Sequence, residues 1–374
     1  MMVSDMRAAP LMTTGLSGGL RLAAAVIAVL LLVAGGGPVS AESLRVRIGF
    51  ASVGADNRQF SGGSSAAIAH SEHYVENELR DLPEVTVEWS FFKGAGPAVN
   101  EAFANNQLDF ALQGDLPQII GRANGLKTKI LLAAGAHAPT YLAVPKDSAV
   151  KRIEDLRGKK VSIFRGTNNH LAAVKALAGH GLQEKDLQVI NMDTATTNAA
   201  LISRDIDAAF GNFPLASLAD KGLAEIIYST KGDSPSYERH STLIAQEGFL
   251  RAHPDVTQKI VNAIVRAAKW SSDEANREAF FEISARTGFP VSGFRFDFEN
   301  QALKYRNSPL IDESIVEHYR FQAKQAKEYG LVRRDVDING WFDRSFLDQA
   351  LASQGLTDYW QAFDATGKPV DPSQ

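Results

Sequence analysis

The sequence contains no cysteine in 374 residues. Without cysteine the chain cannot carry the lipid of a bacterial lipoprotein, and no disulfide framework can form. We therefore expect a protein that is not lipid-anchored and that is held together by its hydrophobic core alone.

A strong excess of charge of either sign is also lacking. The chain has 39 lysine and arginine residues against 43 aspartate and glutamate residues, which gives a formal net charge of −4 at pH 7. A surface that binds nucleic acid or an anionic membrane needs an excess of positive charge. Neither nucleic acid nor a membrane surface is therefore expected as a partner.

A long apolar run lies near the N-terminus. The run LAAAVIAVLLLV (22–33) follows Arg21 and precedes the small residues of GGGPVSA (35–41). This three-part layout is typical of a secretory signal peptide, which we expect to cover residues 1–41 and to be cleaved after Ala41. A membrane anchor is the alternative, but the run is short for the ~30 Å hydrocarbon core of a bilayer.

Strands and helices alternate along the rest of the chain. Apolar stretches of strand length are followed by stretches with the apolar periodicity of a helix. The expected strands include 44–50, 85–92, 159–166 and 187–192, and the expected helices include 64–82, 168–182, 254–287 and 312–330. Such alternation is typical of α/β domains with mostly parallel sheets.

The same order of elements occurs twice, over 44–120 and over 159–218. Within the two stretches, NEAFANNQLDFAL and NAALISRDIDAAF align without a gap, and the alignment pairs Asp109 with Asp207. The chain also exceeds the length at which one hydrophobic core stops growing. We therefore predict two α/β lobes of similar design.

Four corners between a strand and a helix are candidate ligand sites, because ligands of open α/β sheets bind where helix N-termini meet the carboxyl ends of strands. The corners are ASVGADNRQFSGGSS (51–65), QGDLP (113–117), RGTNNH (165–170) and GNFP (211–214). If the lobes face each other, all four corners line one cleft. Asp115 and Asn212 stand where helix N-caps are expected, so helix capping alone is the alternative role of these two residues.

The lobes are expected to be discontinuous in sequence. Two short apolar strands, 139–148 and 240–248, bracket the second lobe and are predicted to run antiparallel as a hinge. The expected parts are residues 42–145 for the first part of lobe 1, 146–240 for lobe 2, 241–351 for the return to lobe 1 with C-terminal helices, and 352–374 for a C-terminal tail.

Several phrases in this order resemble one protein family. They are RIGF after the apolar leader, ALQGDLPQI (111–119), IEDLRGKKVSIFRGTNNH (153–170), DIDAAFGNFP (205–214) and GFLRAHPDVTQKIVNAIVRAAKW (248–270). The chain is similar to the periplasmic substrate-binding proteins of ABC importers for nitrate, taurine and aliphatic sulfonates. The resemblance implies a two-lobed type II periplasmic binding protein. Each lobe would have a mixed, mostly parallel sheet flanked by helices, with the ligand cleft between the lobes.

The same resemblance implies a function and partners. It implies a monomeric periplasmic protein without a cofactor that closes on an aliphatic sulfonate or related sulfur-containing oxyanion. The partners would be an ABC permease and its ATPase at the inner membrane. Nitrate, taurine, a pyrimidine precursor or a flavin remain alternative ligands, and an enzyme of pyrimidine synthesis remains an alternative class.

Two departures from the family pattern leave the ligand open. Family members often have Trp-Asp before the proline of the last corner, where this chain has Asn212 and Phe213. The first corner is longer than usual and contains an insertion over residues 56–59, which includes Arg58. A ligand larger or more polar than a simple alkanesulfonate is compatible with both differences.

The expected ligand-binding residues come from the four corners. Helix N-termini with free amide groups, together with hydroxyl and amide side chains, suit a permanently ionised oxyanion. The expected residues are Arg58, Ser64, Ser65, Gly114, Asp115, Thr167, Asn168, Asn169, His170, Asn212 and Phe213.

Some of these residues have an individual rationale. Arg58 is the candidate cation, or else an arginine of a solvent-exposed loop. Asp115 could accept an ammonium group of a zwitterionic ligand instead of capping a helix. Phe213 and Phe60 could cover the apolar part of a ligand, and His170 could donate a hydrogen bond or only fill space in its helix.

No metal site and no catalytic residue are expected. His70 and His73, with Glu72 between them, have helical spacing that could bind a metal, but a third ligand is missing and a polar helix face is the simpler interpretation. No GxSxG nucleophile motif occurs in residues 42–374. We therefore predict a binding protein and not an enzyme.

Overall fold

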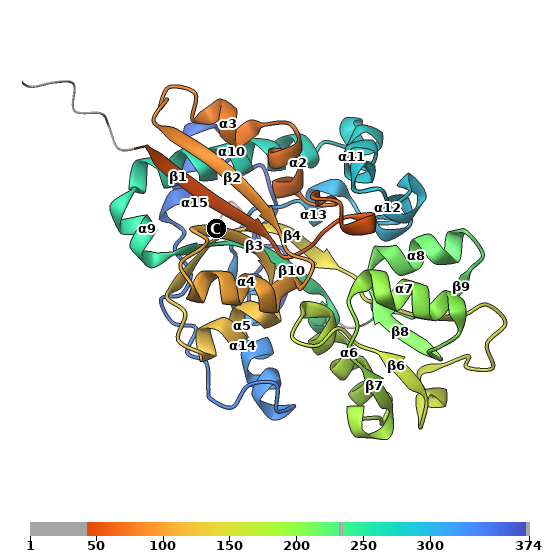
Figure 1. The fold of residues 1–374 in the computed structure, drawn as a ribbon. Helices are drawn as coiled ribbons and strands as arrows, with labels where there is room; N and C mark the ends of the chain where they lie inside the picture. The colour runs from red at the N-terminus through yellow and green to blue at the C-terminus, as the bar shows by residue number, and fades with distance from the viewer. Residues whose placement is uncertain (1–42, 232, 234, 372–374) are drawn as a thin grey trace, which may run out of the picture. The chain divides into compact units, whose positions relative to one another are not determined.

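The computed structural model describes residues 43–231, 233 and 235–371 (Figure 1). The expected signal peptide, residues 1–41, lies outside the described residues. No helix in the described part of the chain is both long enough and apolar enough to cross a membrane.

Two five-stranded sheets form the framework (Figure 1). The first sheet has the order β2, β1, β3, β10, β4, with β1 parallel to β2 and β3 and with β10 antiparallel to β3 and β4. Its strands are β1 (Leu44–Phe50), β2 (Val85–Phe91), β3 (Phe110–Gly114), β4 (Thr128–Ala138) and β10 (Arg239–Gln246). We call this sheet and its helices the first lobe.

The second sheet repeats this design. Its order is β7, β6, β8, β5, β9, with β6 parallel to β7 and β8 and with β5 antiparallel to β8 and β9. Its strands are β5 (Tyr141–Pro145), β6 (Lys160–Ser162), β7 (Gln188–Ile190), β8 (Ala208–Gly211) and β9 (Ala224–Ser229). The expected α/β class with two similar lobes is confirmed.

The two aspartates paired by the sequence alignment occupy the same place in each lobe. Asp109 precedes β3, and its carboxylate accepts a hydrogen bond from the backbone N–H of Arg47 at 2.8 Å. Asp207 precedes β8 and accepts from the backbone N–H of Lys160, also at 2.8 Å. Each carboxylate thus ties the central parallel pair of its sheet together, which explains why the repeat is visible in the sequence.

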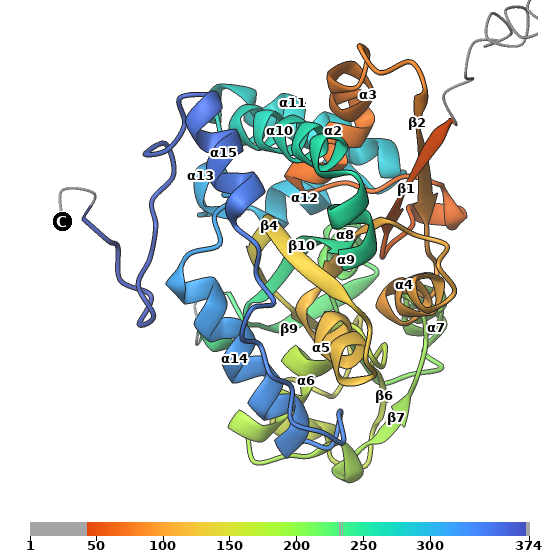
Figure 2. The same cartoon turned by 90° about the vertical axis from the view of Figure 1, so that its left-hand side faces the viewer.

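Helices cover both faces of the first sheet. In Figures 1 and 2, α2, α3 and α10 lie on one side of it and α4 and α5 on the other.

The α-helices of both lobes, in the part of the chain that the structure describes, are α2 (Ser65–Ser71), α3 (Tyr74–Glu78), α4 (Ala95–Ala104), α5 (Asp115–Ala123), α6 (Asn168–Gly179), α7 (Thr194–Ser203), α8 (Phe213–Asp220), α9 (Glu247–Ala252), α10 (Pro254–Ser271), α11 (Arg277–Ser284), α12 (Val291–Asp297), α13 (Leu303–Arg306), α14 (Glu313–Glu328) and α15 (Ser345–Ser353).

The sequence of α10 shows why this helix forms and which face it buries. Pro254 occupies the first turn, where its missing N–H has no intrahelical partner to lose. Val256, Ile260, Ile264 and Ala267 then recur every three or four residues and are all buried. This apolar stripe packs in the main hydrophobic core with the strands of the first sheet.

The chain crosses between the sheets at two adjacent points. Thr140 lies between β4 and β5, and Thr230 follows β9. The Thr230 N–H donates to the Thr140 carbonyl at 3.0 Å, and the Thr140 N–H donates to the Thr230 hydroxyl at 2.8 Å. The two crossing segments are therefore hydrogen-bonded to each other.

This arrangement differs from the expected hinge. The segment 139–148 forms β5 in the second sheet, whereas 240–248 forms most of β10 in the first sheet, so the two do not pair. The sheets change near Thr140 and Thr230, not at the expected boundaries of 145 and 240. The reason is that β5 hydrogen-bonds to β8 and β9, a long-range pairing that local composition does not reveal.

Two expected helices are interrupted. The segment 64–82 divides into α2 and α3 at His73, whose φ of 55° is left-handed. The segment 254–287 divides into α10 and α11, with Asp273 capping the short turn between them. Part of the expected C-terminal tail packs on the first lobe, since Trp360 is buried and its indole N–H donates to Ser272.

Candidate functional site

The helix N-termini of both lobes meet at one cavity of about 200 Å³. The N-cap residues of α2, α5, α6 and α8 all line it, and these are Ser64, Gly114, Thr167 and Asn212. The first two belong to the first lobe and the last two to the second lobe. The four corners expected from the sequence therefore line one cavity.

The caps of the longer helices leave amide groups available. At the start of α6 the Thr167 hydroxyl donates to the Phe164 carbonyl at 2.7 Å instead of capping its own helix. Gly114 has no side chain to cap α5, and the Asn212 side chain makes no capping bond to α8. In α5 and α8 a proline in the first turn has no N–H, and the Leu116 N–H of α5 donates to the Asp115 carboxylate at 2.7 Å. The start of α6 has no proline and no side-chain cap, so its partial positive charge and free N–H groups favour a bound anion most.

A buried arginine supplies full positive charge to the same cavity. Arg239, the first residue of β10, lines the cavity and is only 7% exposed. Its Nη2 donates to the Pro139 carbonyl, but its buried Nε has no hydrogen-bond partner among the described residues. Burial is the main influence on its guanidinium and lowers the pKa of Arg239. A buried cation with an unpaired N–H is the arrangement that an anionic ligand would complete.

The other charged residues of the lining neutralise each other. Asp297 and Arg306 form a buried ion pair with 2.8 Å between the carboxylate and the guanidinium. The Tyr141 hydroxyl also donates to Asp297, at 3.1 Å. Among the described residues that line the cavity, Arg239 therefore carries the charge that no carboxylate pairs with.

Aromatic rings form an apolar part of the lining. The Phe213 ring stacks on Phe294 with 4.4 Å between centroids and meets the edge of Phe289 at 5.3 Å. Phe213 comes from α8 of the second lobe, and the other two rings come from segments of the first lobe. The cavity thus combines a cationic group and helix N-termini with apolar rings.

Six of the eleven expected ligand-binding residues line the cavity: Ser64, Gly114, Thr167, Asn168, Asn212 and Phe213. The other five do not line it: Arg58, Ser65, Asp115, Asn169 and His170. The expected corners thus reach the cavity, but individual side chains within them contact other parts of the protein.

Local contacts explain several of the outlying residues. Arg58 lies in the exposed first corner, and its guanidinium donates to the Arg286 carbonyl at 2.9 Å. The buried Ser65 hydroxyl donates to the Ala134 carbonyl at 3.3 Å. Phe60 is also outside the lining and packs its ring against His70.

Asp115 and His170 have partners of their own. The Asp115 carboxylate accepts from the Leu116 N–H at 2.7 Å and lies 2.8 Å from the His318 ring. His170 accepts from the Gly166 N–H through Nδ1 and lies 3.3 Å from Glu184 through Nε2. The structure thus gives His170 a role in holding its own corner.

The cavity is also lined by residues that the sequence does not predict, among them Arg239, Phe289, Phe294, Asp297 and Arg306. The sequence does show that Arg239 directly precedes the expected strand 240–248. Its place in the cavity lining depends on β10 running antiparallel to β3, which brings Ser241 opposite Gly114 and so places the start of β10 at the carboxyl end of β3. That pairing is not visible in the local sequence.

Comparison with known proteins now adds to the geometry. Residues 90–276 match the family model described as NMT1/THI5 like, which is half of the chain. The chain belongs to the NMT1/THI5-like family. It is 32% identical to a solved structure from Methylobacillus flagellatus KT, named as a periplasmic sulfonate-binding protein SsuA, with a TM-score of 0.71. The match covers 86% of this chain and 98% of that protein.

Two more distant structures share the fold of this NMT1/THI5-like protein. The alkanesulfonate-binding protein SsuA from Xanthomonas axonopodis pv. citri, bound to MOPS, is 20% identical over 82% of this chain and all of its own, with a TM-score of 0.68. The desulfurization enzyme DSZB is 16% identical over 83% of this chain and all of its own, with a TM-score of 0.63. The expected two-lobed binding-protein fold is confirmed.

Proposed function

We propose that this protein is the solute-binding component of an ABC importer and that it binds an aliphatic sulfonate or a related sulfur-containing oxyanion. The cavity between the two lobes would be the binding site. The observation that carries the proposal is Arg239, a buried cation whose Nε has no partner among the described residues.

A sulfonate matches the polar part of this lining. The sulfonate group keeps its single negative charge at any physiological pH. Its three oxygens can accept from the Arg239 guanidinium and from the free N–H groups at the N-terminus of α6. The Asn168 side chain adds an amide donor at the same place. The single unbalanced charge suits a monoanion better than a dianion such as sulfate.

The apolar part of the lining favours an organic anion. Nitrate and sulfate have no carbon atoms to place against Phe213, Phe289 and Phe294, whereas an alkyl chain buries its surface there. A zwitterion such as taurine would need an acceptor for its ammonium group. Asp115 does not line the cavity, and the Asp297 carboxylate is already paired with Arg306. We therefore place simple alkanesulfonates ahead of taurine.

The remaining parts of the proposal follow from the family. The protein would act as a monomer in the periplasm after removal of residues 1–41, and it would deliver its ligand unchanged to a permease and ATPase. A flavin or a pyrimidine precursor is the second candidate ligand class, since the ring cluster around Phe213 could stack on a heterocycle. A neutral heterocycle could accept from the Arg239 Nε but would leave the guanidinium charge without a counter-charge.

A thermal-shift screen tests the ligand class. The panel contains alkanesulfonates of two to eight carbons, taurine, sulfate, nitrate, riboflavin and a hydroxymethyl pyrimidine. We expect the melting temperature to rise with alkanesulfonates and to rise less with taurine, sulfate and nitrate, because bound ligand stabilises the folded state. A rise with the heterocycles and none with any sulfonate would overturn the proposal.

A further inference from the structure

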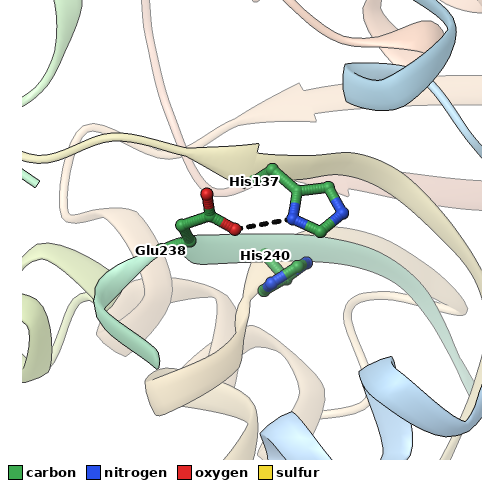
Figure 3. A group of neighbouring side chains, drawn as sticks. All are labelled: His137, Glu238 and His240. Carbon is green, nitrogen blue, oxygen red and sulfur yellow. Dashed lines mark hydrogen bonds and ion pairs between the residues drawn. The ribbon is translucent and has the colours of Figure 1, made fainter. Parts of the chain in front are cut away.

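Three ligand-type side chains meet beside the crossing between the lobes (Figure 3). His137 lies near the end of β4, Glu238 directly precedes β10, and His240 is its second residue. One nitrogen or oxygen atom from each residue lies within 4.8 Å of the other two. The closest approach is 2.6 Å, between His137 Nδ1 and Glu238 Oε2.

This cluster is distinct from the anion cavity. Successive side chains of a strand point to opposite faces, and Arg239 between Glu238 and His240 lines the anion cavity. His137 instead lines a second cavity of about 660 Å³, together with Tyr305. The His137 and Glu238 side chains are 16% and 17% exposed, so an ion could reach them from solvent.

His240 provides an independent sign that a ligand is missing. Its side chain is 3% exposed, and its Nδ1 has no hydrogen-bond partner among the described residues. A buried polar atom without a partner is costly and uncommon.

We propose that His137, Glu238 and His240 bind a divalent transition-metal ion of the zinc type. Two imidazole nitrogens and one carboxylate oxygen are the ligands that zinc accepts, and three protein ligands leave a fourth position for water. Calcium and magnesium prefer sites built from oxygen atoms alone. In binding, the ion replaces the hydrogen bond between His137 and Glu238 with metal bonds to both.

The neighbouring rings hold the two imidazoles in place. The Tyr305 ring stacks on His137 with 3.7 Å between centroids and 14° between planes. The His318 ring packs against His240 at 4.2 Å, and its own Nε2 lies 2.8 Å from the Asp115 carboxylate. Imidazoles fixed in this way lose little rotamer freedom on binding an ion, which favours affinity.

The test is metal binding by the full-length chain, purified without a polyhistidine tag and treated with a chelator. Isothermal titration with Zn²⁺ is expected to show one ion per chain. The Glu238→Gln and His137→Gln variants should weaken binding by at least the roughly 10- to 100-fold typical of losing a supporting group at a metal site. Both positions are partly exposed, so both variants are expected to fold, which circular dichroism verifies.

A matched control tests whether zinc binding depends on this site in particular and not on any histidine that lies beside a glutamate. His180 Nδ1 lies 2.8 Å from Glu154 on the second lobe, so His180→Gln removes a similar pair and should leave Zn²⁺ binding unchanged. Co²⁺ bound to the unmodified protein should show the visible absorption of a four-coordinate site. The proposal is overturned if Zn²⁺ does not bind, if both variants bind as well as the unmodified protein, or if the Co²⁺ absorption is absent.

Discussion

At the scale of single residues, the positive charge of the cavity lies on a residue of a strand, and the neutral hydrogen-bond donors lie at the N-termini of helices. Arg239 is buried at the start of β10 and is held through the Pro139 carbonyl. Asn168 stands in the first turn of α6, where side chains and free amides reach the cavity together. Arg239 and Asn168 lie on different elements, so a substitution at one of them should not displace the other.

Replacing Asn168 tests the contribution of a neutral donor. Asn168→Ala removes one hydrogen bond to the anion, worth about 1 kcal/mol, and should weaken sulfonate binding roughly fivefold. Asn169→Ala is the matched control, because Asn169 is the next residue in the same helix turn but does not line the cavity. Titration calorimetry that gives equal losses for both variants would contradict this placement.

His70 makes stability depend on pH. Its ring packs among Phe50, Phe60, Trp89 and Phe91, and burial lowers the pKa of His70 below the ordinary 6.5. The unfolded chain therefore takes up a proton more readily as pH falls below 6.5, and stability is lost there. The urea midpoint should fall between pH 7 and pH 5.5, and it should fall less in His70→Leu. An equal fall in both proteins would show that His70 is not responsible.

At the scale of elements, the buried pair between α12 and α13 should dominate local stability. Asp297→Ala leaves Arg306 buried without its carboxylate, and removal of one partner of a buried pair costs about 3–5 kcal/mol. Arg295→Ala on the same helix breaks an exposed pair with Glu278 and should cost far less. Urea unfolding of the two variants measures the difference, and equal losses would contradict this prediction.

The sequence predicts the elements well where local signals decide them. A glycine, a capping residue and an early proline place the starts of α5 and α8 within a residue or two, and the repeat locates Asp109 and Asp207 correctly. The break at His73 is missed because a left-handed residue inside an apolar helical pattern has no glycine to signal it.

The candidate site is predicted less completely than the elements. Corners can be located from local sequence, but the side chains that enter the cavity depend on partners far away in the chain. The Ser65 hydroxyl donates to the Ala134 carbonyl, and the Asp115 carboxylate contacts His318. Neither partner can be predicted from the sequence of the corner. Arg239 reaches the cavity only through the antiparallel pairing of β10 with β3.

At the scale of the whole molecule, the two lobes touch around the cavity. Lys93 of the first lobe lies 3.3 Å from Asp193 of the second lobe. Gly114 lies so close to Asn168 that a Cβ atom on Gly114 would be 2.7 Å from the Asn168 Cβ and closer to its amide. This approach requires glycine, and it depends on the lobes being together.

Gly114→Ala should therefore oppose closure of the lobes. In the unmodified protein, sulfonate is expected to reduce the radius of gyration measured by small-angle X-ray scattering, because ligand binding selects the closed form. The variant should show a smaller reduction and weaker binding. Gly248→Ala is the control, since a Cβ at that position meets no atom within 4 Å. An unchanged reduction in Gly114→Ala would contradict this account of closure.

The most direct measurement is the affinity of three proteins for one alkanesulfonate by titration calorimetry. The unmodified protein should bind one molecule per chain, and Arg239→Gln should bind roughly 10- to 100-fold more weakly because a charge-assisted hydrogen bond is lost. Arg58→Gln should bind like the unmodified protein, because Arg58 does not line the cavity. Full affinity in Arg239→Gln, or an equal loss in Arg58→Gln, would contradict the assignment of the buried arginine as the anion-binding group.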